Sequence, residues 1–172
     1  ELHLEIITNR LKDKEHFGLN VKVHKPRVSY RETVKTAGEA EEEFFRAAEG
    51  KTHFARVKVR LEPAEKSEGI EVISRLKPGD ISPESERVLR QAVLESAQSG
   101  WMLGFPLMYV RFTILNVGYR EGESTEEALR AAASHAVQSA LGKTKIGLLE
   151  PIMKVEVVTP ADFLGNIQGD LN

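Results

Sequence analysis

The chain has 172 residues, of which 41% are hydrophobic and 29% charged, and its formal net charge is −2. This composition is typical of one soluble globular domain, or of one domain with parts of its neighbours, and it excludes a polycation. Nucleic-acid binding would therefore need a local basic patch. The absence of Cys excludes disulfides and Cys-based zinc sites, and it agrees with a reducing compartment.

The first half of the chain predicts a helix followed by strands. Apolar residues at three- and four-residue spacing indicate a helix over 1–16, and extended segments are expected at 19–23 and 27–34, separated by Lys25-Pro26. Residues 38–48 have the Glu and Ala content of a helix, but they lie between two strands, and we predict a strand. The clearest strand is 52–63, whose apolar side we assign to Phe54, Val57, Val59 and Leu61.

The second half alternates strands and helices. A short strand at 69–76 precedes a helix at 82–100, with Ser82 as N-cap, Pro83 in the first turn and Gly100 at the end. A central apolar strand is expected at 106–117. A second helix follows at 124–142, with a capping box from Ser124 and Glu127. A strand at 148–160 and the start of a helix at Thr159 to Asp162 complete an α+β fold, a mixed sheet covered by helices on one face.

We expect neither a signal peptide nor a membrane span, because no leader pattern and no apolar run of sufficient length is present. The first residue is not Met, and the last residues follow directly on a predicted helix. Both ends therefore predict a segment cut from a longer protein.

The tripeptide Gly-Lys-Thr occurs twice, at 50–52 and at 142–144, and raises the question of a phosphate-binding loop. Such a loop needs a second Gly five residues before the Gly-Lys pair, a preceding strand and a following helix. Those positions hold Phe45 and Val137, the first tripeptide precedes a strand, and the second follows a helix. We expect no nucleotide site, and hence no cofactor, in this chain.

Other catalytic patterns are also missing. The five His residues are widely spaced, and no pair has the helical spacing of metal ligands. No Ser lies in a nucleophile elbow, and there is no Cys nucleophile. The sequence therefore predicts no metal and no catalytic residue.

A basic row offers a better candidate. Between residues 46 and 60 the single acid is Glu49, and the basic residues are Arg46, Lys51, Arg56, Lys58 and Arg60, with His53. Alternation places Arg56, Lys58 and Arg60 on one side of a strand. Such a row either contacts RNA phosphates or is a solvated sheet face opposite the acids at 41–43, and charge alone leaves both interpretations open.

Several stretches resemble the translation elongation factor G family, in the family's order. "ELHLEIITNRLK" is similar to the end of its third domain, and "KPRVSYRETV" to the entry into its fourth. "YREGESTEEALRAAASHA" resembles a fourth-domain loop and helix, and "LLEPIMKVEVVTPADFLGNIQGDLN" resembles the passage into the fifth domain. The resemblance divides the chain into the end of the third domain (1–24), the fourth domain (25–148) and the start of the fifth domain (149–172).

The resemblance implies a fold with a left-handed β-α-β crossover and a cytoplasmic, ribosome-binding role. The family is a GTPase that moves tRNA and mRNA through the ribosome, and its fourth domain reaches the decoding region of the small subunit. GTP and magnesium would be bound by a domain outside this chain. The expected partners are small-subunit rRNA and the tRNA–mRNA complex, with ribosome recycling factor as a further partner and no membrane.

Two loops at the tip of the fourth domain make the family's contacts. One is usually glycine-rich and corresponds to residues 47–56, where Gly50 is the single remaining glycine and Lys51 keeps the basic position. The other usually has a His after a Tyr. Here Tyr119 matches, and Arg120 replaces the His. By this resemblance we predict RNA contacts from Lys51, His53, Arg56, Tyr119 and Arg120.

These departures at the tip leave more than one function open. The first hypothesis is a translocation factor. The second is a paralogue that acts in ribosome splitting, recycling or rescue. A third, from a different class, is a freestanding module that binds a protein through its basic strand.

Overall fold

The computed structural model describes residues 2–13, 17–24, 28–48, 50–65, 67, 69–154, 156–160 and 163–170. Three sequence predictions fall outside this range: the end of the first helix at 14–16, the break at Lys25-Pro26 and the contribution of Asp162 to the last helix. In the described part of the chain, no helix combines the length and apolar character needed to cross a membrane.

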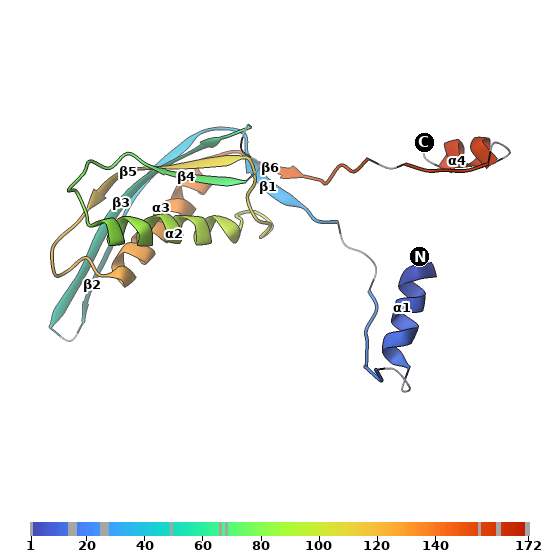
Figure 1. Cartoon of the computed structure of the whole chain (residues 1–172). Coiled ribbons are helices and arrows are strands. Elements are labelled where there is room, and N and C mark those ends of the chain that lie inside the picture. The colour runs from blue at the N-terminus through green and yellow to red at the C-terminus, as the bar shows by residue number, and fades with distance from the viewer. Residues whose placement is uncertain are drawn as a thin grey trace.

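A four-stranded mixed sheet forms the body of the domain, in the order β2-β3-β5-β4 (Figure 1). Its strands are β2 (Gly38–Ala48), β3 (Lys51–Pro63), β5 (Val110–Gly118) and β4 (Ile70–Ser74). β2 and β5 are antiparallel to β3, whereas β4 is parallel to β5 and connects to it through α2 (Pro83–Gln98). A second, two-stranded sheet pairs β1 (Arg31–Val34) with β6 (Ile146–Leu149). The predicted mixed sheet and the strand prediction for 38–48 are confirmed.

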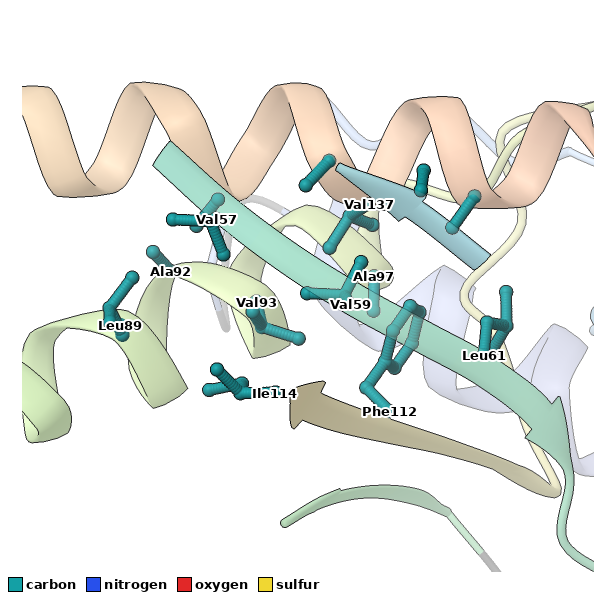
Figure 2. Packing of buried hydrophobic residues seen from close by; sticks show 14 of the residues in the cluster. Val57, Val59, Leu61, Leu89, Ala92, Val93, Ala97, Phe112, Ile114 and Val137 are labelled. Carbon is teal, nitrogen blue, oxygen red and sulfur yellow. The ribbon is translucent and has the colours of Figure 1, made fainter. Parts of the chain in front are cut away.

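Helices α2 and α3 (Glu126–Gly142) pack on one face of this sheet and on each other. Alternate β3 residues point at the helices, as in any strand with one buried face. Figure 2 shows Val57 and Val59 of β3 between α3 and the α2 side chains, with Leu61 farther along the strand. The alanines of α3 allow its backbone to lie close to the strands, and the buried ones are Ala128, Ala132, Ala133, Ala136 and Ala140.

Helices α2 and α3 both begin with a side-chain cap. The cap of α2 is the predicted residue, and the cap of α3 is not. Ser82 caps α2 as expected, because its Oγ accepts a hydrogen bond from the Ser85 N–H at 3.1 Å. The predicted capping box of Ser124 and Glu127 is wrong, since Thr125 is the N-cap of α3. Ser124 instead turns its hydroxyl toward β3, where it serves the candidate site.

The segments at both ends of the chain stand apart from the sheet (Figure 1). They contain α1 (Leu2–Lys12) and α4 (Leu164–Asp170). The predicted strand at 19–23 is wrong, and the one predicted at 148–160 stops at Leu149. A strand needs a neighbour for its backbone groups, and these segments pair with none in the described structure. Ile152 and Val158 are consequently 98% and 93% exposed.

A buried carboxylate joins β1 to the loop after α2. Glu32 is fully buried and accepts hydrogen bonds from four backbone N–H groups, those of Trp101 (2.7 Å), Met102 (3.0 Å), Leu103 (2.7 Å) and Phe105 (3.3 Å). Burial alone would raise the pKa of Glu32, but these hydrogen bonds outweigh it and hold the pKa below its ordinary value. The carboxylate therefore stays ionised and fixes the loop at the base of the sheet.

Candidate functional site at the tip of the sheet

The β2–β3 hairpin extends beyond the rest of the sheet (Figure 1). The last residue of β5, Gly118, pairs with Arg56, whereas β2 and β3 continue pairing as far as Ala48 and Lys51. Gly50 forms the turn with a φ of +76°, a conformation that costs glycine little. Lys51 is therefore at the exposed end of the hairpin, as the resemblance predicts for a tip residue.

The loop between β5 and α3, residues 119–125, is bonded to the side of this hairpin. The Phe54 N–H donates to the Glu123 carbonyl at 3.0 Å, and the Ser124 hydroxyl donates to the Phe54 carbonyl at 2.7 Å. The Ser124 Oγ also accepts from the Arg120 N–H at 2.8 Å. His53 Nδ1 lies 3.0 Å from the Thr125 hydroxyl oxygen. The two tip loops are thus one bonded unit.

Arg120 covers Phe54 on the open face of the sheet. The guanidinium carbon lies 3.8 Å from the ring centroid, and Nη1 is 3.2 Å from a Glu123 carboxylate oxygen. The prediction that Phe54 lies on the apolar side with Val57 is wrong. Residues 54 and 56 are two apart on the strand and therefore share a face. In agreement, a Cβ built on Gly118 would meet both the Phe54 ring and the Arg56 Cβ. Phe54 is buried on this open face by the loop, not by the helices.

The five predicted contact residues are divided between the two faces of the sheet. Arg56 and Arg120 lie on the open face, and Tyr119 follows Gly118, which pairs with Arg56. His53 lies on the opposite face of β3 and contacts Thr125 at the start of α3. Lys51 lies farther out along the hairpin. Three further residues of the candidate site were not predicted: Phe54, Glu123 and Ser124. For Phe54 a signal was available, because residues 54 and 57 are three apart and therefore lie on opposite faces of a strand.

The row of basic residues on β3 is neutralised by neighbouring acids. The Arg56 Nε donates to Glu43 at 3.0 Å, Lys58 lies 2.8 Å from Glu39, and Arg60 lies 3.3 Å from Glu62. The hydrogen bond from Lys58 lowers the pKa of Glu39, and the Glu43 carboxylate raises the pKa of Arg56. This pairing favours the solvated-face interpretation for the row. A phosphate at Arg56 would have to compete with Glu43.

The two Gly-Lys-Thr tripeptides lie outside any phosphate-loop geometry. Lys51 begins a strand, and Gly142 is the last residue of α3, with β6 following. The Lys143 Nζ donates to the Glu39 carbonyl at 3.0 Å. Within the described ranges, no three His, Cys, Asp or Glu side chains gather into a group that would hold a metal ion.

Removing the Ser124 hydroxyl is expected to loosen the tip. In Ser124→Ala, the buried Phe54 carbonyl and the Arg120 N–H both lose their partner, so the free energy of unfolding should fall by about 2 kcal/mol. Urea denaturation of the variant would measure this change. Ser29→Ala, at an exposed position, is the control and should change stability by less than about 0.5 kcal/mol. Equal stability of both variants would contradict the role of Ser124.

Comparisons with known proteins agree on one family. The model of elongation factor G domain IV matches residues 26–145. The chain is 42% identical to elongation factor G of Thermotoga neapolitana and 41% identical to that of Thermotoga maritima. Both alignments cover 174 residues, with 100% of this chain and 25% of the relative. The chain thus spans about a quarter of the length of these relatives.

The fold comparison agrees with the sequence comparison. A crystal structure of a protein from Thermus thermophilus is similar with a TM-score of 0.84 and 32% identity. The match covers 99% of this chain and 25% of that protein.

Proposed function

Because the chain belongs to the elongation factor G family, we propose that it is the ribosome-binding part of a translational GTPase. In this role the tip enters the decoding region of the small subunit and promotes movement of tRNA and mRNA. The single observation that best supports the proposal is that the two predicted tip loops, distant in sequence, are bonded into one protruding unit.

The mechanism assigned to this chain is mechanical. After tRNA and mRNA have moved, the hairpin and the loop at 119–125 occupy the space beside the codon. They thereby block backward movement of the RNA. Hydrogen bonds through Ser124 keep the two loops in a fixed relation, so a force on one is transmitted to the other. GTP and magnesium belong, in this proposal, to a domain outside the chain, which supplies the energy of hydrolysis.

The proposed domain boundaries are 1–24 for the end of the third domain, 25–148 for the fourth and 149–172 for the start of the fifth. The matched range of 26–145 and the paired span from β1 to β6 support the limits of the fourth domain. The exposed apolar side chains outside this span are those of Leu4, Ile7, Phe17, Ile152, Met153 and Val158, among others. They are expected to pack within those neighbouring domains.

A second role remains open because the tip differs from the family pattern. It has a single glycine in the hairpin turn region and Arg120 where the family usually has His. A paralogue acting in ribosome splitting, recycling or rescue would retain the fold and alter these positions. In ribosome splitting, its partner would be ribosome recycling factor. Rates of translocation and of subunit splitting, both measured with the full-length protein, separate the two roles.

Charge reversal at the tip tests the proposed function. In the full-length protein, Lys51→Glu combined with Arg120→Glu should weaken ribosome binding by at least about tenfold and slow translocation, because two cations near RNA become anions. Lys35→Glu with Lys145→Glu makes the same change in net charge at exposed positions next to the β1–β6 pair and is the matched control. Unchanged binding and translocation in the tip variant, or an equal loss in the control, would overturn the assignment.

A further inference from the structure

The Phe54–Arg120 stack presents an open planar cation at the tip. Phe54 is 5% exposed, because the guanidinium of Arg120 covers its ring at 3.8 Å. The Arg120 side chain is itself 55% exposed. The guanidinium thus lies over the ring, and more than half of the Arg120 side chain remains exposed to solvent.

Two contacts restrain this guanidinium before any ligand arrives. Its Nη1 is paired with Glu123, and its carbon lies over the Phe54 ring. A side chain held this way loses little rotamer entropy on binding. Directly across the strand pair from Phe54 lies Phe45, which is 60% exposed. Side chains of paired residues share a face, so a second aromatic surface adjoins the stack.

The charges around Arg120 disfavour a phosphate as its ligand. Its own carboxylate partner, Glu123, sits on one edge of the guanidinium. The same loop also contains Glu121, whereas Glu126 and Glu127 in the first turn of α3 are paired with Arg130 and Arg46. A phosphate at Arg120 would meet the charge of Glu121 and compete with Glu123. A neutral planar group on the open face meets neither obstacle.

We propose that the Phe54–Arg120 stack is a platform for an unpaired nucleobase of RNA, which lies on the open face of the guanidinium. This inference rests on the proposed function and names the part of RNA that the tip contacts. Splayed-out bases in RNA commonly stack on aromatic rings and on Arg guanidinium planes. The ion pair between Arg120 and Glu123 stays intact in such a complex, because the base stacks on the face of the guanidinium and Glu123 contacts its edge.

Two substitutions in the full-length protein separate planarity from charge. Arg120→Lys keeps the positive charge and removes the plane, and ribosome affinity should fall about tenfold, the scale of one lost stacking contact. Arg120→Trp keeps a plane and removes the charge, and affinity should stay within about threefold of the original. Glu123→Gln is the third variant. It weakens the ion pair that restrains Arg120, so affinity should fall by about two- to threefold, the scale of one exposed ion pair, while its salt dependence stays unchanged.

The opposite pattern would overturn the platform. If Arg120→Lys binds ribosomes like the original protein and Arg120→Trp binds weakly, the ligand is a phosphate. Tighter, more salt-sensitive binding by Glu123→Gln would lead to the same conclusion. These outcomes differ from failure of the proposed function, in which the Lys51→Glu, Arg120→Glu variant itself binds ribosomes normally.

Discussion

Replacing Glu32 by Gln is expected to lower the free energy of unfolding by about 3 kcal/mol, because a fully buried carboxylate that accepts four backbone hydrogen bonds becomes an amide. The Gln side chain has one acceptor oxygen, and its NH₂ group would face N–H donors. Thermal unfolding should show a midpoint roughly 6–12 °C lower for a chain of this size. Glu150→Gln, at an exposed position after β6, should leave the midpoint unchanged.

The stabilisation that Glu32 provides is expected to depend on pH. The pKa of Glu32 is lowered in the folded state, so the unfolded chain binds the proton more readily. Stability from this group is then fully present above the unfolded pKa, about 4.3, and is lost as the pH falls through the folded pKa. The difference in stability between the original chain and Glu32→Gln should therefore narrow below about pH 4.3. A difference that stays constant from pH 7 to about pH 3 would contradict this account of the loop.

Local patterns predicted the elements of the central sheet and the helices on it. The alternation in β3 from Arg56 to Leu61 and the Ser82 cap of α2 are set by nearby residues, and the structure confirms both. Phe54 departs from the predicted alternation, because the loop at 119–125 buries it on the open face. The segments at 19–23 and 150–160 also have strand-like composition. Whether they become strands depends on a neighbouring backbone, which residues close in sequence do not specify. The shift of the α3 cap from Ser124 to Thr125 has a similar cause, since Ser124 bonds to β3 instead.

The sequence indicates which charged residues to consider at the tip, and their contact with RNA stays a prediction. It does not indicate how these residues are arranged. Lys51 and Arg120 were found from a resemblance, and each lies on one of the two tip loops. The stacking of Arg120 on Phe54 depends on a contact between residues far apart in sequence. The pairing of Arg56 with Glu43 depends on the register of β2 against β3. Counting basic residues therefore overstates the positive charge available to RNA on this sheet face.

Substituting Gly100 by Ala is expected to destabilise the domain by about 4 kcal/mol, through strain and a steric clash together. Gly100 has a φ of +67°, which L residues rarely adopt. An added Cβ would also lie 2.3 Å from the Phe105 carbonyl oxygen and 2.8 Å from its nitrogen, so backbone atoms would have to move. Because the Phe105 N–H donates to Glu32, this movement disturbs the carboxylate site as well.

Gly104→Ala separates the two contributions within the same loop. Gly104 has a similar φ of +79°, but the nearest atom to an added Cβ is the Ser99 carbonyl oxygen at 3.9 Å. This control should therefore show the conformational cost alone, about 1–2 kcal/mol. Urea denaturation of both variants measures the difference, which we assign to the clash with Phe105. Equal losses of stability in the two variants would mean that the loop relaxes freely. That result would contradict the statement that Glu32 fixes residues 101–105.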